Sequence, residues 1–234
     1  MVEEKTIIEP LVSIIIATLN SERFLRDALT SVESQGYSNF EILMIDGGST
    51  DNTKKIGSSF KKVKIIEQSG KGLFVAWNEG LIAAKGDFIA FLDSDDFWGK
   101  DALGEHMKAL LGEPNSLGSL GRLKFFVEDG QKPPAEFKLS LLNGDHLAYM
   151  PGCFVGRKEI FELIGLFETQ WEIASDIVWF SKIKELEEGI VFVNDIVLNK
   201  RVHNKNISYA AAETNTYSKE LLQLLHNKLK NRNS

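Results

Sequence analysis

Three carboxylates lie within four residues at Asp93, Asp95 and Asp96, directly after an apolar run at residues 88–92. Carboxylates this close repel one another unless they are solvated or bind a cation. A hard divalent ion such as Mg²⁺ or Mn²⁺ prefers oxygen ligands and usually keeps positions for substrate phosphates. The cluster is therefore a candidate site for Mn²⁺ or Mg²⁺ holding a diphosphate. A solvated acidic turn is the alternative.

Two further polar groups follow apolar runs in the same way. Thr18 and Asn20 come after residues 11–17, and Asp46 comes after residues 40–45. The carboxylate of Asp46 is suited to accept a hydrogen bond from a nucleobase N–H or a ribose hydroxyl, and two glycines after it allow close backbone approach. An ordinary Asp-Gly turn is the alternative reading.

The elements that would position these residues alternate along the first half of the chain. Residues 11–17, 40–45, 63–66 and 88–92 have the apolar composition of buried parallel strands. Stretches with helical spacing of apolar residues separate them. This order predicts an α/β fold with a parallel sheet and helices on both faces. Ligands of such sheets collect beyond the carboxyl ends of the strands, so the three polar groups would face one crevice.

The second half of the chain is less regular. Strands are expected at residues 152–155, 190–193 and 196–202, and helices at 157–164 and 176–187. The tail carries leucines at helical spacing together with lysines and an arginine, which predicts an amphipathic helix. Neither an internal repeat nor a clean linker is evident, so we expect one domain over residues 1–234.

Composition limits the class of partner and compartment. The formal net charge of −6 over 234 residues does not favour a nucleic-acid partner. The one cysteine, Cys153, excludes an internal disulfide and fits a reducing cytoplasm. No stretch reaches the ~18 apolar residues of a membrane span. We expect a cytoplasmic protein; the basic C-terminal helix leaves open peripheral contact with the inner face of the membrane, or packing on a partner such as a second copy.

Over residues 11–98 the chain resembles the family 2 glycosyltransferases, which have the GT-A fold. The resemblance is carried by the opening strand with its Asn20, by residues 41–53 (EILMIDGGSTDNT), by residues 76–78 (AWN) and by residues 91–96 (FLDSDD). Looser similarity continues at residues 154–157, 165–167, 174–176 and 201–203. No glycine-rich loop follows the first strand, which argues against a nucleotidyltransferase or a nicotinamide-dependent oxidoreductase.

The resemblance implies a role for each matching residue. Asp95 would be the direct metal ligand, His203 a further metal or pyrophosphate contact, and Asp176 the catalytic base. A helix N-cap is the alternative for Asp176, and a surface histidine for His203. The residues expected to bind the nucleotide sugar are Thr18, Asn20, Asp46, Lys71, Asn78, Asp93, Ser94 and Arg201.

The implied activity is that of an inverting glycosyltransferase. It would move a sugar from a nucleotide-sugar donor, expected to be UDP-linked, to a hydroxyl of a saccharide or lipid-linked acceptor in polysaccharide or glycolipid synthesis. Residues 11–98 would bind the donor, residues 112–208 would supply the acceptor and catalytic half, and residues 209–234 would form the C-terminal helix. A catalytically inactive sugar-nucleotide-binding module is the alternative.

Overall fold

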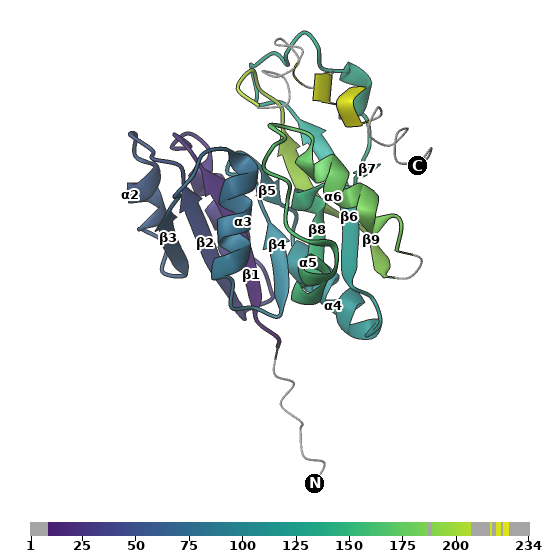
Figure 1. Ribbon diagram of the computed structural model, residues 1–234. Helices are drawn as coiled ribbons and strands as arrows, with labels where there is room; N and C mark the ends of the chain where they lie inside the picture. The colour runs from purple at the N-terminus through teal and green to yellow at the C-terminus, as the bar shows by residue number, and fades with distance from the viewer. Residues whose placement is uncertain (1–8, 187–188, 207–215, 217–218, 221, 225–234) are drawn as a thin grey trace.

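The computed structural model describes residues 9–186, 189–206, 216, 219–220 and 222–224. Within these residues a nine-stranded mixed sheet runs in the order β3-β2-β1-β4-β8-β6-β9-β5, and β7 pairs with β6 (Figure 1). The strands are β1 (Val12–Thr18), β2 (Phe40–Asp46), β3 (Val63–Glu67), β4 (Phe88–Phe91), β5 (Phe97–Trp98), β6 (Gly118–Phe126), β7 (His146–Leu147), β8 (Phe154–Arg157) and β9 (Ile190–Arg201).

The first half of the sheet is parallel, as the sequence predicts. β1 pairs with both β2 and β4, and β2 pairs with β3, all in parallel register. All residues of β4 and most of those of β1 and β2 are buried, which explains their continuous apolar runs. Thr18 lies opposite Asp46 in the register of β1 and β2. The polar ends of these strands therefore lie side by side.

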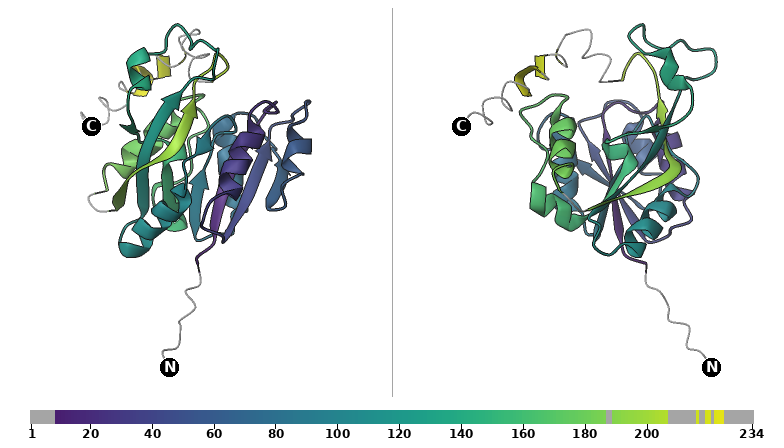
Figure 2. Two further views of the ribbon diagram at one scale, coloured as in Figure 1. Left: turned by 180° about the vertical axis from the view of Figure 1, so that it is seen from behind. Right: turned by 90° about the vertical axis from the view of Figure 1, so that its right-hand side faces the viewer.

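Helices cover both faces of the sheet, which confirms the expected layers. On one face lie α3 (Leu73–Ala83), α5 (Lys158–Ile164) and α6 (Ser175–Ile183). On the other lie α1 (Leu25–Glu33) and α4 (Ala102–Gly112), seen from behind in Figure 2. The remaining short helices are α2 (Thr53–Gly57), η1 (Leu139–Leu142) and η2 (Pro151–Cys153).

The second half of the sheet is mixed. β8 pairs antiparallel with β4 and β6, β9 runs parallel to β6, and β5 pairs antiparallel with β9. β6 was not expected from the sequence, because Gly118 and Gly121 weaken its strand signal. A Cβ at Gly118 would meet the Phe154 ring at 2.4 Å, and one at Gly121 would meet Val197 at 2.5 Å. Close packing of neighbouring side chains therefore requires both glycines.

Several expected boundaries differ from the structure. β9 is one continuous strand, Ile190–Arg201, where two were expected. α6 begins at Ser175 and ends at Ile183. Of the expected C-terminal helix, residues 216, 219–220 and 222–224 are helical and the rest lies outside the described residues. None of the helices described has the length and apolar content to cross a membrane.

Candidate active site

A cavity of about 1040 Å³ opens at the carboxyl ends of the parallel strands. Its lining comes mainly from residues 17–24, 70–77, 93–95, 172–176 and 200–206. Both halves of the chain therefore contribute to it. The predicted site residues that line this cavity are Thr18, Asn20, Lys71, Asp93, Ser94, Asp95, Asp176 and His203.

Asp46 does not line the cavity but organises the turn beside it. Its side chain is fully buried. Oδ1 accepts hydrogen bonds from the hydroxyls of Thr18 at 3.1 Å and Ser49 at 2.6 Å. Oδ2 accepts from the backbone N–H groups of Gly48 and Ser49 at 3.1 and 2.9 Å. These four bonds fix the loop that follows β2, and the expected contact between Asp46 and a nucleoside stays a prediction.

Asn20 does not cap the following helix. It adopts a left-handed conformation with φ 50°, which asparagine tolerates better than most residues. Its Oδ1 accepts a hydrogen bond from the Thr50 N–H at 2.9 Å, which joins the loops after β1 and β2. α1 begins later, at Leu25. Asn20 thus shapes one wall of the cavity.

The three acidic residues after β4 form one compact cluster. Carboxylate oxygens of Asp93, Asp95 and Asp96 all lie within 4.8 Å of one another. Asp93 and Asp95 line the cavity, whereas the side chain of Asp96 is fully buried. Burial, together with the neighbouring carboxylates of Asp93 and Asp95, raises the pKa of Asp96 to about 7 although the Lys200 charge lowers it. Burial also raises the pKa of Asp93. The cluster is therefore electrostatically strained without cations.

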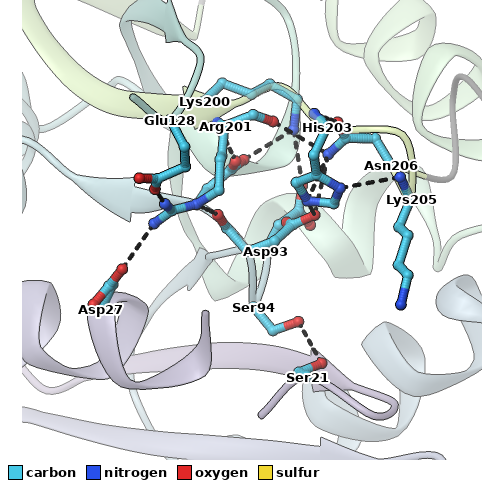
Figure 3. A network of polar contacts seen from close by, with 12 residues as sticks. Ser21, Asp27, Asp93, Ser94, Glu128, Lys200, Arg201, His203, Lys205 and Asn206 are labelled. Carbon is cyan, nitrogen blue, oxygen red and sulfur yellow. Dashed lines mark hydrogen bonds and ion pairs between the residues drawn. The ribbon is translucent and has the colours of Figure 1, made fainter. Parts of the chain in front are cut away.

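Lys200 on β9 supplies one such cation (Figure 3). Its Nζ lies 2.9 Å from Asp96 Oδ2 and 3.2 Å from Asp93 Oδ2. Burial opposes the charged ammonium, but the Asp96 and Asp93 carboxylates outweigh it and hold the pKa of Lys200 well above its usual value. The backbone N–H of Arg201 donates a second hydrogen bond to Asp96 at 2.8 Å. Two residues of β9, more than 100 positions further along the chain, thus hold the acidic cluster in place.

Asp95 is held by a different pair of residues. Its Oδ2 contacts His203 Nε2 and accepts from Asn206 Nδ2, each at 3.1 Å. Burial opposes the shift, but the His203 hydrogen bond and the Lys200 charge lower the pKa of Asp95. The Lys205 N–H donates to His203 Nδ1 at 3.1 Å, so Nε2 carries the proton of a neutral ring. Metal ligation through Nε2 would require the other tautomer, and that role of His203 stays a prediction.

Arg201 faces away from the cavity. Residues alternate faces along a strand, so Lys200 and Val202 line the cavity while Arg201 points to the opposite side. Its buried guanidinium donates to the Asp95 carbonyl oxygen at 2.8 Å and pairs with Asp27 at 2.9 Å and with Glu128. These contacts position the segment that carries Asp95. The expected contact of Arg201 with a diphosphate stays a prediction.

Asp176 lies in the first turn of α6 and lines the same cavity as Asp93 and Asp95. Burial raises its pKa to about 6, and the Asp93 charge adds to this effect. Asp176 is not the N-cap, which is Ala174. Glu220 instead accepts hydrogen bonds from the N–H groups of residues 172, 173 and 174, at 2.6, 3.0 and 2.9 Å. One carboxylate thereby ties down the loop that leads to Asp176.

The other predicted site residues divide between the cavity and the scaffold. Ser94 lines the cavity and its hydroxyl lies 2.8 Å from that of Ser21. Lys71 is exposed at the cavity edge. Asn78 is not in the lining, because its side-chain amide pairs with both the N–H and the carbonyl of Phe167. Trp77 lines the cavity, and its Nε1 is buried with no hydrogen-bond partner among the described residues.

Sequence reasoning did not single out Lys200, Asn206 or Glu220. Lys200 directly precedes Arg201, the predicted site residue on β9, and strand alternation from His203 gives no guide because the strand ends at Arg201. Asn206 follows His203 by three residues in a turn, a weak local signal. Glu220 reaches the loop before α6 from about fifty residues away, and no local pattern announces such a contact.

The chemistry of this donor set fits a hard divalent cation. Asp93 and Asp95 present carboxylate oxygens to the cavity, the ligand type that Mg²⁺ and Mn²⁺ prefer. The residues that would hold the ion are Asp95 first and Asp93 second, because Asp96 is fully buried behind them.

Several solved structures have the same fold. TarS from S. aureus in complex with UDP-GlcNAc superposes with a TM-score of 0.67 at 23% identity, covering 83% of this chain and 59% of that chain. The mannosyltransferase PcManGT from Pyrobaculum calidifontis, in complex with GDP-Man and Mn²⁺, gives a TM-score of 0.67 at 20% identity, covering 96% and 65%. These likenesses confirm the predicted GT-A fold.

Sequence comparison points to the same family. The putative glycosyltransferase EpsH of Bacillus subtilis (strain 168) is 29% identical over 206 residues, covering 86% of this chain and 58% of EpsH. The putative teichuronic acid biosynthesis glycosyltransferase TuaG of the same organism is 33% identical over 127 residues, covering 52% and 50%. The chain thus spans between half and three fifths of these relatives. The family description "Glycosyl transferase family 2" matches residues 13–165, more than half of the chain, and the protein belongs to this family.

Proposed function

We propose that this chain transfers a sugar from a nucleoside-diphosphate donor to an acceptor hydroxyl, with inversion at the anomeric carbon. The observation that carries the proposal is one cavity lined both by Asp93 and Asp95, which follow β4, and by Asp176, which lies on α6. Charge on a departing diphosphate and a proton on an attacking hydroxyl are the two problems of such a transfer. The acidic cluster in the cavity could hold a cation that balances the charge of the diphosphate. The separate carboxylate of Asp176 could accept the proton of the attacking hydroxyl.

Residues 11–98 would hold the donor and residues 112–208 would receive the acceptor. Thr18, Asn20 and Lys71 line the donor side, and the volume suits a nucleotide sugar. A divalent ion bound at Asp95 and Asp93 would supply positive charge to the diphosphate. Complexes of structurally similar proteins with UDP-GlcNAc and with GDP-Man and Mn²⁺ support a nucleotide-sugar donor. We propose UDP as its nucleotide.

Asp176 is the proposed base. Its pKa, raised by burial to about 6, keeps it ionised at neutral pH while bringing it close to the operating pH, as general-base catalysis favours. Among the described residues, two carboxylates besides Asp176 and the acidic cluster line the cavity. Glu128 is paired with Arg201, and Glu172 is exposed. A single base acting opposite the leaving group would invert the anomeric centre.

The names of the relatives suggest a class of product. TuaG is described as a teichuronic acid biosynthesis glycosyltransferase. We propose that this chain likewise serves polysaccharide or glycolipid synthesis, with a saccharide or lipid-linked acceptor.

Thermal unfolding with UDP, GDP, CDP and dTDP, each with and without Mn²⁺, tests donor binding. A ligand at about 100 times its dissociation constant stabilises by about 2.7 kcal/mol, which corresponds to roughly 5–10 °C for a chain of this length. We expect UDP with Mn²⁺ to raise the midpoint, Asp95→Asn to abolish the rise, and the matched control Asp195→Asn, exposed on β9 outside the cavity, to retain it.

Product formation then separates an enzyme from an inactive binding module. With the donor identified, Asp176→Asn should bind it normally but lose turnover, whereas Glu172→Gln should retain turnover. Donor binding with no turnover in the wild type, across a panel of saccharide and lipid-linked acceptors, would favour the binding module. No stabilisation by any nucleotide would overturn the proposed donor site.

A further inference from the structure

Lys200 contacts one carboxylate oxygen of Asp93, a proposed metal ligand, and one of the buried Asp96. Its ammonium bridges Asp96 Oδ2 at 2.9 Å and Asp93 Oδ2 at 3.2 Å, and its side chain is only 19% exposed. Lys132 and Lys205 also line the cavity, but neither side chain contacts a carboxylate among the described residues. In Figure 3, the side chain of Lys205 extends away from the cluster that Lys200 enters. Lys200 is therefore built into the cluster, while its neighbours are peripheral.

The charge of the cluster changes accordingly. Three carboxyl groups share a single ammonium, and they share it unequally. Lys200 pairs with Asp93 and Asp96, while Asp95 receives its hydrogen bonds from His203 and Asn206. A divalent ion that engages Asp93 must displace the ammonium from Oδ2, share that oxygen with it, or bind Oδ1 beside it, in each case at a cost in electrostatic free energy because the two cations repel each other. The free protein is thus a poorer metal site than three carboxylates alone would be.

We infer that Lys200 is a resident cation of the donor site, which competes with the divalent ion for Asp93 and makes tight binding of that ion depend on the donor diphosphate. This inference rests on the proposed function. A bound diphosphate brings anionic oxygens that both cations can share, so their repulsion is offset only when it is present. Because coupling between two ligands is reciprocal, the ion would strengthen nucleotide binding by the same factor.

Direct measurement of Mn²⁺ binding to the full chain tests the inference without any activity assay. Free Mn²⁺ is quantified by its electron paramagnetic resonance signal, first in the absence of nucleotide and then with saturating UDP. Lys200→Met removes the resident cation but leaves the buried Asp96 carboxylate without its ion pair. The double variant Lys200→Met/Asp96→Asn removes both partners and keeps the net charge of the wild type. Lys205→Met is the control for loss of one lysine beside the same cavity.

Without nucleotide, the double variant should bind Mn²⁺ at least about tenfold more tightly than the wild type, within the usual range of site coupling. Lys205→Met should stay within about threefold of the wild type, since an exposed charge that contacts no carboxylate among the described residues is largely screened. In the wild type, UDP should tighten Mn²⁺ binding by at least about tenfold, and in the double variant by clearly less.

A folded double variant that binds Mn²⁺ no more tightly than the wild type would overturn the inference. If neither Lys200→Met nor the double variant folds, the measurement on the wild type decides. A change of less than about threefold in its Mn²⁺ affinity on adding UDP rules out the proposed dependence. Failure of the proposed function gives a different pattern, in which no nucleoside diphosphate binds the wild type with or without Mn²⁺. Nucleotide binding with unaltered Mn²⁺ affinity in the double variant would defeat this inference alone.

Discussion

Replacing Arg201 by lysine tests whether its guanidinium fastens the acidic segment or contacts the donor. The guanidinium is buried, donates to the Asp95 carbonyl at 2.8 Å, and lies 4.3 Å above the Phe24 ring. Its ion pairs are with Asp27 and Glu128. Lysine keeps the charge but presents a single ammonium, which cannot reach acceptors on three sides at once.

The expected loss of stability follows from these contacts. A charged hydrogen bond to the buried Asp95 carbonyl contributes about 1.5–3 kcal/mol, and stacking on Phe24 contributes about 0.5–1 kcal/mol. The side chains of Asp27 and Glu128 are 59% and 41% exposed, so their ion pairs are screened and add about 0–1 kcal/mol. Arg201→Lys should therefore lower the free energy of unfolding by about 2–5 kcal/mol, or roughly 5–20 °C in midpoint.

Urea unfolding with linear extrapolation measures this loss. Arg122→Lys is the matched control, because Arg122 pairs with Asp145 at a half-exposed position, and it should cost less than about 1 kcal/mol. Nucleotide affinity is measured on the same samples and should change little. An Arg201→Lys variant as stable as the wild type that binds nucleotide tenfold more weakly would refute the positioning role and favour the diphosphate contact expected from sequence.

Three further predictions concern groups with perturbed environments. Asp176 must be ionised to act as a base, and burial raises its pKa to about 6. We therefore expect kcat/KM to fall about tenfold per pH unit below pH 6. A flat profile of kcat/KM from pH 5 to 7 would contradict its role. Glu220→Gln leaves one side-chain oxygen for three backbone N–H groups, so steady-state kinetics should show kcat lowered about tenfold with donor affinity retained; wild-type kcat would rule out its positioning of Asp176. Burial lowers the pKa of His106 to about 3, so between about pH 3 and 6.5 the unfolded chain binds a proton that the folded chain does not. The free energy of unfolding should therefore fall by about 1.4 kcal/mol for each pH unit below about 6.5. In His106→Gln the pH dependence of the urea midpoint should be flatter.

The sequence predicted where the site lies better than which way its side chains point. Apolar runs and helical spacing were sufficient to locate β1 to β4, and the rule for parallel sheets then placed Thr18, Asp93 and Asp95 at one edge. That edge is where the cavity opens. Local patterns suffice here because β1, β2 and β4 are buried on both faces and each polar group lies at or directly after the end of a strand.

The direction of a side chain depends on the pairing register of its strand, which could not be predicted from the sequence. On β9, Lys200 lines the cavity and Arg201 faces the opposite side, so a shift of one residue exchanges their roles. Asp46 and Asn78 lie near the site, but their side chains form hydrogen bonds with backbone groups around them. Contacts between distant elements decided these cases, and a single sequence carries little information about them.

The ion pairs of Lys200 join residues 107 and 104 positions apart along the chain, and β9 itself lies between β6 and β5 in the sheet. The entropic cost of closing so long a loop is offset only when β9 pairs with β6 and β5 in the sheet. Non-local strand pairing of this kind is slow. Before that step, β5 lacks its partner strand and Asp96 lacks both its ammonium and its backbone donor. Completion of the sheet and assembly of the acidic cluster are therefore one folding event. A folding intermediate with the four parallel strands formed would have no functional donor site, so nucleotide binding during refolding should report the arrival of β9.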